Sequence, residues 1–337
     1  ITVMKKIAES GIAIIFITHR LEEVMAAANS ITILRDGKLA ATRSVQDTSI
    51  VELAELMIGR KGESVVDAQP RTGHGDKVAL RLRDLQVRMP GEKVRGVDLD
   101  VYEGEIFGIG GLAGQGKLGI PNGVMGLYET TGQVELFGQP LKTGDTNAAL
   151  HAGLAMVSED RKGVGLLLDQ SIEDNIVFNA MQVHGDYLKK LGPFTLKDSK
   201  AIRKTANEMI QELDIRCFGP TQAAGTLSGG NQQKVCIARA LCMKPKFLFV
   251  SEPTRGIDIG AKKLVLETLM KLNREKGMTV VIVSSELQEL RSISDRIAIV
   301  SEGKLVDILA PDASDADFGL AMSGIRPGDH KKEGSAQ

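Results

Sequence analysis

The chain has 337 residues, of which 42% are hydrophobic and 25% are charged, a composition typical of a globular protein of about two domains. Its formal net charge of −1 without a long basic run excludes nucleic acid as an expected partner, and its three cysteines (Cys217, Cys236 and Cys242) lack a metal-binding spacing and indicate reduced, buried thiols. No apolar run approaches the roughly 18–20 residues that span a bilayer, so a role in transport would require separate membrane subunits.

Residues 1–61 have the pattern of the end of a domain. Residues 11–19 predict a buried strand, residues 21–28 a helix, and residues 31–39 two strands joined by a turn. The same pattern recurs at residues 277–285 and 297–305, always 266 positions later. A gapless match over about 30 residues indicates a tandem duplication.

The second copy begins near Val78. The constant offset places the start of the first copy about 190 residues before Ile1, so we expect most of a first domain to lie outside this chain. We therefore expect four segments. They are residues 1–61 as the end of the first copy, 62–77 as a polar linker, 78–324 as the complete second copy, and 325–337 as a disordered tail.

The second copy opens with alternating apolar and polar residues from 78 to 101, which predict antiparallel strands. A buried strand at 105–110 then leads into a Gly-rich loop that matches G-x-x-x-x-G-K-[ST] except at its last position. The loop residues are Gly111, Leu112, Ala113, Gly114, Gln115, Gly116, Lys117 and Leu118. Backbone N–H groups of such a loop surround a phosphate, and Lys117 reaches the β- and γ-phosphates. Leu118 replaces the hydroxyl that would bind Mg²⁺.

Two other interpretations of this loop stay open. Gly108, Gly110 and Ala113 also fit the dinucleotide-binding fingerprint, with Glu129 at a suitable distance for a ribose-binding acid. This interpretation explains neither Lys117 nor the motifs downstream. The other interpretation is a Gly-rich turn with a purely structural role.

Residues 153–162 predict a strand followed by a charged loop that contains Glu159. For such a charge cluster, a solvated surface loop is the simpler interpretation. Residues 171–176 predict a capped helix start, and the pattern stays helical to about residue 214. We therefore expect a helical insertion at about residues 171–226.

The most specific motif of the chain is Leu227-Ser228-Gly229-Gly230-Asn231-Gln232, which runs into an apolar helical pattern. The start of that helix can leave N–H groups and the positive end of the helix dipole open to an anion. Alone, Ser-Gly-Gly before a helix is ordinary capping. An apolar strand at residues 246–250 then ends in Ser251 and Glu252, and Glu252 can serve as a general base.

The Gly-rich loop, the Leu-Ser-Gly-Gly helix start and the strand ending in Glu252, in this order, resemble the ATP-binding cassette (ABC) family of transport ATPases. The form L-S-G-G-N-Q-Q-K-V looks like the carbohydrate-uptake branch, whose members are two fused cassettes. The resemblance covers nearly all of the chain. It implies an α/β P-loop NTPase fold with an antiparallel β subdomain and an inserted α-helical subdomain, and it implies ATP and Mg²⁺ as cofactors.

The resemblance also implies roles for single residues. Glu159 falls at the Q-loop, which couples the nucleotide site to the membrane subunit, and Asp258 falls in the D-loop, which touches the opposing cassette. Ser285 stands where active cassettes have a switch histidine, whereas the first copy has His19 at the equivalent position. Ser251 stands where the Walker B aspartate supports Mg²⁺.

In this family two cassettes meet head to tail, so each ATP lies between the P-loop of one cassette and the signature of the other. The signature of this chain would therefore close over an ATP held by a partner cassette. The loss of two Mg²⁺-supporting groups, at Leu118 and Ser251, compounds to about 10²–10⁴-fold in affinity or activity. No intact metal site is expected, and we expect this cassette to bind Mg²⁺ and nucleotide weakly and to hydrolyse ATP slowly or not at all.

The expected function is that of an ATP-binding subunit that powers import of a sugar or a related small solute. Its partners would be membrane permease subunits, a complete cassette from a partner chain and, indirectly, an external solute-binding protein, at the cytoplasmic face of a bacterial inner membrane. The alternatives are a non-hydrolysing ABC-fold regulatory or scaffold subunit and a nucleoside importer of the same architecture. An ABC ATPase of translation or DNA repair does not fit the N-Q-Q-K-V continuation.

Overall fold

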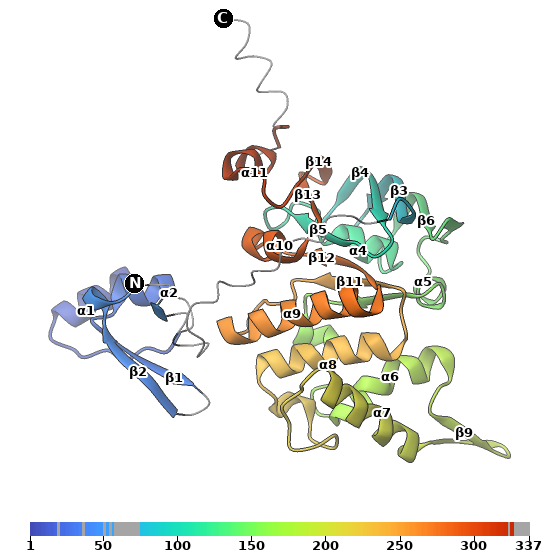
Figure 1. Cartoon of the computed structure of the whole chain (residues 1–337), viewed down its shortest axis with the longest axis horizontal. Coiled ribbons are helices and arrows are strands. Elements are labelled where there is room, and N and C mark those ends of the chain that lie inside the picture. The colour runs from blue at the N-terminus through green and yellow to red at the C-terminus, as the bar shows by residue number, and fades with distance from the viewer. Residues whose placement is uncertain are drawn as a thin grey trace, which may run out of the picture. The chain divides into compact units, whose positions relative to one another are not determined.

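The computed structural model describes residues 1–18, 21–35, 38–49, 52–53, 56, 75–322 and 324–326. The chain divides into two compact units, which are described separately. The first unit consists of Ile1–Asp67 and Ile257–Leu264, and the second of Ala68–Gly256 and Val265–Gln337. Figure 1 shows the helices and strands of both units. The predicted segment boundaries at residues 61, 77 and 324 stay predictions.

Among the residues that the structure describes, the first unit includes the helices α1 and α2 and a β-hairpin (Figure 1). They are α1 (Thr2–Glu9), α2 (Leu21–Ala27), β1 (Ser30–Arg35) and β2 (Lys38–Ser44), followed by the short helix η1 (Val45–Asp47). The two strands pair antiparallel, as predicted, and the predicted turn at residues 36–37 lies outside the described residues. A small core of Val24, Ile31, Ile33 and Leu53 holds these elements together.

The predicted buried strand at residues 11–19 is wrong for the part of it that the structure describes. Residues 12–18 form no strand, and the side chains of Ile15 and Ile17 are 95% and 98% exposed. At the position 266 residues later, β12 (Thr279–Val283) is fully buried and is hydrogen-bonded on both sides to other strands. Apolar side chains alone do not make a strand when no neighbouring strand supplies the hydrogen bonds.

The repeat in the sequence is accompanied by a repeat of helices and strands. Shifted by 266 residues, the bounds of α2 and β1 coincide with those of α10 (Leu287–Ile293) and β13 (Arg296–Ser301). The two hairpins even carry an irregularity of strand register at the same place, between Ile33 and Leu34 in β1 and between Ile299 and Val300 in β13. The elements match at the offset seen in the sequence, and the duplication itself stays a prediction.

The second unit is built on a six-stranded sheet with the strand order β14-β13-β5-β12-β11-β8. Its strands other than β12 and β13 are β5 (Ile106–Gly110), β8 (Leu154–Val157), β11 (Phe247–Ser251) and β14 (Lys304–Leu309). All neighbours pair parallel except β13 and β14. All five residues of β5, β11 and β12 are buried, which agrees with their continuous apolar sequences.

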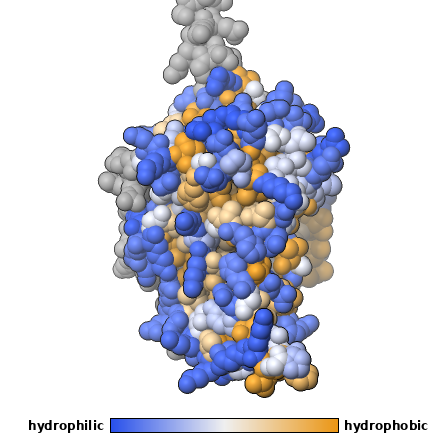
Figure 2. Space-filling model, turned by 90° about the vertical axis from the view of Figure 1, so that its right-hand side faces the viewer, coloured by the Kyte–Doolittle hydropathy of each residue, from blue (hydrophilic) through white to orange (hydrophobic). Residues whose placement is uncertain are grey.

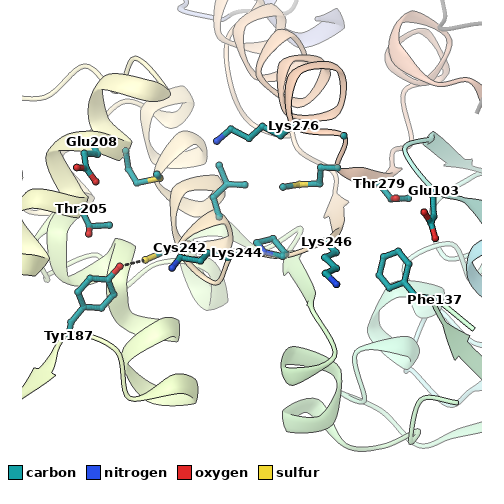
Figure 3. Close-up of a pocket in the computed structure, with 15 residues that line it drawn as sticks. Glu103, Phe137, Tyr187, Thr205, Glu208, Cys242, Lys244, Lys246, Lys276 and Thr279 are labelled. Carbon is teal, nitrogen blue, oxygen red and sulfur yellow. Dashed lines mark hydrogen bonds between the residues drawn. The ribbon is translucent and has the colours of Figure 1, made fainter. Parts of the chain in front are cut away.

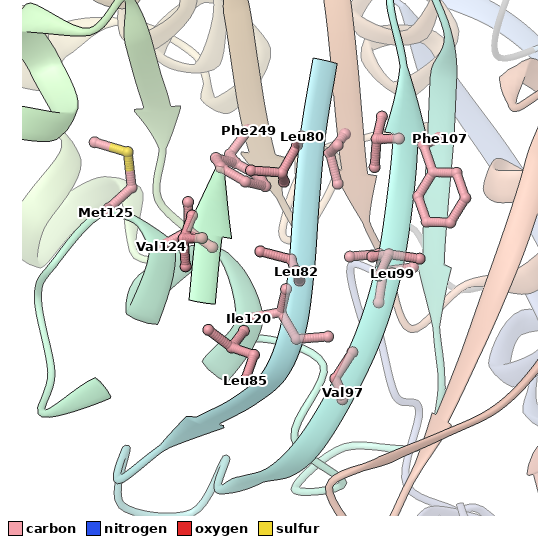
Figure 4. Packing of buried hydrophobic residues seen from close by; sticks show 14 of the residues in the cluster. Leu80, Leu82, Leu85, Val97, Leu99, Phe107, Ile120, Val124, Met125 and Phe249 are labelled. Atoms are coloured by element: carbon pink, nitrogen blue, oxygen red, sulfur yellow. The ribbon is translucent and has the colours of Figure 1, made fainter. Parts of the chain in front are cut away.

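A four-stranded antiparallel sheet of order β4-β3-β6-β7 packs on this core. Its strands are β3 (Val78–Val87), β4 (Val94–Tyr102), β6 (Thr130–Leu136) and β7 (Gln139–Pro140), and the strands predicted at 78–101 are confirmed. Figure 4 shows side chains of β3, β4, α4 and β11 in one cluster, among them Leu82, Leu99, Ile120 and Phe249. The cluster lies between the two sheets and fixes the loop that follows β5.

An ion pair within the six-stranded sheet also contacts the antiparallel sheet. The fully buried carboxylate of Glu105, at the start of β5, lies 2.6 Å from Nε of Arg296 at the start of β13. Glu105 also accepts the N–H of Tyr102 at the end of β4. The guanidinium of Arg296 lies 4.7 Å from the ring centre of Tyr102 and 5.0 Å from that of Phe107. One arginine thus ties a strand of each sheet together.

Eight helices of the described second unit surround these sheets, counting α9, which begins in the first unit. They are α4 (Gly119–Val124), α5 (Thr146–His151), α6 (Ile172–His184), α7 (Ser199–Glu212), α8 (Gly229–Cys242), α9 (Ile259–Lys276), α10 and α11 (Asp315–Met322). In Figure 1, α6, α7 and α8 lie together on the far side of β11 from β3 and β4. α6 and α7 lie within the helical insertion predicted at about residues 171–226, whereas α8 begins after it.

One part of the helical prediction is wrong, because an antiparallel hairpin interrupts residues 171–214. Its strands β9 (Leu188–Leu191) and β10 (Phe194–Lys197) are exposed along their whole length. The predicted start of α6 is confirmed, since the hydroxyl of Ser171 accepts the N–H of Asp174. Each flanking helix therefore has its own beginning and end.

The face shown in Figure 2 is mainly hydrophilic at its edges, with apolar side chains between polar ones along its middle. Among the helices that the structure describes, each is too short or too polar to cross a membrane.

Burial separates the three cysteines. Cys236 and Cys242 are buried, as predicted, whereas Cys217 is partly exposed. Desolvation by burial raises the pKa of the Cys236 thiol from an ordinary value of 9.0 to about 12. Near pH 8 this thiol therefore carries almost no thiolate, which is the reactive form.

At pH 8 we expect a thiol reagent to label Cys217 in the native chain and Cys236 only after denaturation. The folded state retains the Cys236 proton to a higher pH than the unfolded state does, so the free energy of unfolding should fall as the pH rises from about 9 to about 12. Mass spectrometry of labelled peptides, with fully denatured protein as the control, measures the first effect. Rapid native labelling of Cys236 would contradict it.

Candidate functional site

The candidate site lies where the Gly-rich loop leaves the carboxyl end of β5 and enters α4. Ligands of open α/β sheets bind at this edge of the strands. The loop needs its glycines. Gly114 and Gly116 have positive φ angles of 77° and 99°, and a Cβ at Gly111 would lie 2.3 Å from the carbonyl oxygen of Val300. The sequence therefore specifies a tight loop whose backbone N–H groups turn toward one side.

Lys117, Glu252 and Ser285 meet at this edge, although they are far apart in the sequence. Nζ of Lys117 lies 3.5 Å from Oε1 of Glu252, and the hydroxyl of Ser285 donates to the same oxygen at 2.6 Å. The Lys117 side chain is 1% exposed and that of Glu252 is 10% exposed. Three predicted residues thus form one cluster, in which the candidate general base is held by a cation and a hydroxyl.

Glu252 adopts an unusual backbone conformation, with a positive φ of 46°. Its N–H donates to the carbonyl oxygen of Val283 at the end of β12, at 2.7 Å. Left-handed conformations cost free energy in residues other than glycine and cluster at functional sites. The hydrogen bond between the ends of β11 and β12 thereby holds the Glu252 backbone so that its carboxylate faces Lys117 of the Gly-rich loop.

The two residues at the Mg²⁺ positions are both present at this edge, but they do not fit the ion. Ser251 is fully buried, and its hydroxyl has no hydrogen-bond partner. Leu118 packs against the hydrophobic core. Mg²⁺ binds through carboxylates and water in octahedral geometry, and neither side chain supplies a carboxylate. Within the described residues, no group of three or more His, Cys, Asp or Glu side chains could hold a metal ion.

Glu92 is a site residue that the sequence analysis missed. It lies in the turn between β3 and β4 and is buried, with 7% of its surface exposed. Its carboxylate accepts the N–H groups of Gly114 and Gly116 at 2.8 Å each and that of Leu118 at 3.2 Å. The partners are 22 to 26 residues away in sequence, so no local motif pointed to this contact.

A second missed network supports the segment after Glu252. The buried carboxylate of Glu289 accepts the hydroxyl of Thr254 and, at 3.0 Å, that of Ser284. Because Thr254 follows β11 and Ser284 follows β12, Glu289 links the ends of two neighbouring strands. This fixes the distance between Glu252 and Ser285.

The predicted Q-loop residue Glu159 is partly exposed and accepts the hydroxyl of Ser158 at 3.2 Å. The residue that makes long-range contacts here is Arg161. Its Nε donates to the side-chain oxygen of Gln232 at 3.2 Å, and its Nη1 donates to the carbonyl oxygen of Arg255 at 3.5 Å. Burial lowers the pKa of Arg161 from its ordinary value. Arg161 thus connects α8 to the segment after β11.

The signature motif starts α8, as predicted. Ser228 is exposed and makes no side-chain cap to its own helix, and its hydroxyl instead accepts the amide of Asn231 at 3.0 Å. Leu227 and Gly230 are buried, and Gly229 is partly buried. Gln232 is 4% exposed and bonds to Arg161, so it has a structural role within this chain. Ser228 is therefore the motif residue most open to an outside group.

Asp258 and His19 are the two remaining predicted site residues. Asp258 belongs to the first unit and is exposed, and its carboxylate accepts the N–H of Ala261 at 2.9 Å, near the start of α9. His19 lies outside the described residues. Their predicted roles stay predictions.

A cavity of the second unit lies away from this cluster. It holds about 700 Å³ and is lined by residues that precede β11 and β12, such as Lys246 and Met278. These are the amino ends of strands whose carboxyl ends carry Glu252 and Ser285. Figure 3 shows Tyr187 pointing to Cys242 in this cavity, and desolvation by burial raises the pKa of Tyr187 to about 12. None of the predicted site residues lines it.

Comparison with known proteins finds one matching family model and several similar proteins. Residues 94–255 match the family model described as ABC transporter. The chain is 36% identical over 328 residues to the ribose import ATP-binding protein RbsA 2 of Rhizobium meliloti (strain 1021), which covers 96% of this chain and 62% of that protein. It is 34% identical over 329 residues to the nucleoside import ATP-binding protein NupA of Lactococcus lactis subsp. cremoris (strain MG1363), covering 96% and 63%. The chain thus spans less than two thirds of the length of these relatives.

Solved structures agree on the architecture. The ATP-binding cassette MJ1267 of an ABC transporter aligns with a TM-score of 0.60 and 19% identity, over 74% of this chain and 96% of that one. The dimeric cassette MJ0796, bound to ADP and Pi in a post-hydrolysis state, aligns with a TM-score of 0.57 and 24% identity, over 70% of this chain and 100% of that one. At this level of identity the likeness concerns the fold.

Proposed function

We propose that the chain, whose second unit has the fold of an ATP-binding cassette, is an ATP-binding subunit that powers import of a sugar or a nucleoside. It would act at the cytoplasmic face of a bacterial inner membrane, on separate permease subunits that receive solute from an external binding protein. Relatives named for ribose import and for nucleoside import support both solute classes.

The observation that carries this proposal is the meeting of the Gly-rich loop with Lys117 and Glu252 at one edge of the sheet. Its backbone N–H groups already converge on one anion, the carboxylate of Glu92, so they can hold phosphate oxygens in the same way. Lys117 supplies a positive charge beside them. When bound, ATP would supply the phosphate anhydride bond, and Glu252 would orient water toward it.

We further propose that this cassette contributes chiefly its signature to a shared site. The residues at the two Mg²⁺ positions do not fit the ion, whereas Ser228 is exposed at the start of α8, with its hydroxyl outside the helix cap. Such a chain would complete the ATP site of a partner cassette while its own site turns over slowly. The poor fit to Mg²⁺ equally favours a non-hydrolysing regulatory or scaffold subunit of the same fold.

Equilibrium binding of a fluorescent ATP analogue, with and without Mg²⁺, tests the proposal. We expect weak binding that Mg²⁺ hardly changes, and we expect Lys117→Ala to weaken it by about 10-fold or more because a charged hydrogen-bond donor is lost. Lys142→Ala removes an exposed lysine that pairs with Asp145 and is the matched control.

Two outcomes would decide against parts of the proposal. Tight binding that requires Mg²⁺ would refute the degenerate site. Binding that is absent, or that Lys117→Ala leaves unchanged, would refute the role as an ATP-binding subunit. Because Lys117 also pairs with Glu252, the unfolding temperature of the variant has to be measured alongside.

A further inference from the structure

The phosphate-binding loop of this chain already holds an anion of its own. Oε1 of Glu92 accepts the N–H of Gly114, and Oε2 accepts those of Gly116 and Leu118. These are the N–H groups of the motif that a nucleotide phosphate would use. A carboxylate with three backbone donors is a charge-assisted arrangement, about twice as strong per bond as a neutral one.

The backbone around Glu92 is built to keep the carboxylate there. A Cβ at Gly116 would lie 2.5 Å from the carbonyl oxygen of Lys93, and a Cβ at Gly119 would lie 2.1 Å from that of Glu92 itself. The turn between β3 and β4 therefore packs directly on the loop, and glycines make the approach possible. The N–H of Glu92 donates to the carbonyl oxygen of Met89 within the same turn.

The lysine of the motif is engaged in the same manner. Nζ of Lys117 pairs with Glu252 at 3.5 Å. Two carboxylates of the chain thus satisfy both means by which the loop attracts phosphate, namely its N–H groups and its positive charge. Each N–H has one hydrogen to donate, so a phosphate oxygen and Glu92 compete for it.

We propose that Glu92 is an internal competitor for the phosphate site and sets its affinity for nucleotide. Nucleotide binds only when the Glu92 carboxylate leaves its three donors, and the free energy of that exchange weakens binding. This inference rests on the proposed function, because it concerns the same loop. Glu92 lies outside the motif and occupies the N–H groups of the loop until its carboxylate moves away.

The test compares the unmodified chain with Glu92→Gln and Glu92→Asp. The glutamine keeps the size but removes the negative charge, and the aspartate keeps the charge but shortens its reach. Glu103→Gln, an exposed carboxylate at the end of β4 with no contact to the loop, is the control for net charge. Calorimetry measures the binding of ATP and of inorganic tripolyphosphate, and thermal unfolding reports the fold.

We expect Glu92→Gln to bind both ligands about 10-fold more tightly, Glu92→Asp to bind them more tightly by a smaller factor, and Glu103→Gln to match the unmodified chain. Unchanged or weaker binding by a folded Glu92→Gln would overturn the inference and leave the ATP-binding role standing. Tighter binding of tripolyphosphate without binding of ATP would uphold the inference and refute that role. Unfolding of both Glu92 variants would assign Glu92 to holding the loop in shape and overturn the inference.

Discussion

Leu118→Thr combined with Ser251→Asp should raise the affinity of the ATP complex for Mg²⁺ by about 10²–10⁴-fold, because each restored group is worth roughly 10–100-fold. The threonine places a hydroxyl at the end of the phosphate loop, and the aspartate places a carboxylate at the end of β11. Mg²⁺ favours oxygen ligands of this kind. Titration of Mg²⁺ against the complex with an ATP analogue measures the effect.

The stability of this variant gives a second readout. Ser251 is fully buried beside Glu252, so an aspartate there is a buried charge next to another carboxylate, which costs free energy without a cation. Mg²⁺ with nucleotide should therefore raise the unfolding temperature of the variant and hardly change that of the unmodified chain. Leu118→Val with Ser251→Ala is the control that changes both sites without adding a metal ligand. Equal Mg²⁺ responses in variant and control would refute the degenerate-site proposal.

Arg296→Ala should lower the free energy of unfolding by about 3–5 kcal/mol, since it leaves the carboxylate of Glu105 buried and unpaired. Glu105 is fully buried, and Arg296 donates to both of its oxygens, at 2.6 and 3.0 Å. The arginine also donates to the carbonyl oxygen of Asp100 at 2.9 Å. Denaturant unfolding followed by circular dichroism measures the loss.

Two controls make this result specific to the buried pair. Arg83→Ala removes an arginine from a pair with Asp100 in which the Arg83 side chain is 41% exposed, so it should cost at most about 1 kcal/mol. Arg296→Met with Glu105→Gln removes both charges and should recover much of the loss. A cost of Arg296→Ala no larger than that of Arg83→Ala would contradict the expectation that this pair stabilises the fold.

The sequence predicted those parts of this protein whose signals are local. The fold of the cassette, the strands β5, β11 and β12 and the start of α8 are confirmed. A buried parallel strand is a continuous apolar run, and a phosphate loop needs glycines at fixed spacing, so a few consecutive residues suffice to identify either one. The match between segments 266 positions apart is equally visible in the sequence, and the two hairpins at these positions have the same register irregularity.

Only the tertiary structure determined the features that depend on contacts between residues far apart in the sequence. Residues 12–18 have the same apolar residue types as β12 but pair with no strand within the described residues. The same residue types therefore form a strand in one place and not in the other. Glu92 looks like an ordinary charge in a turn, and only the packing of that turn on the loop turns its carboxylate toward three N–H groups. Arg161 and Gln232 meet across 71 positions. Hydrogen bonds between distant segments depend on how whole elements dock, and no spacing in the sequence encodes that.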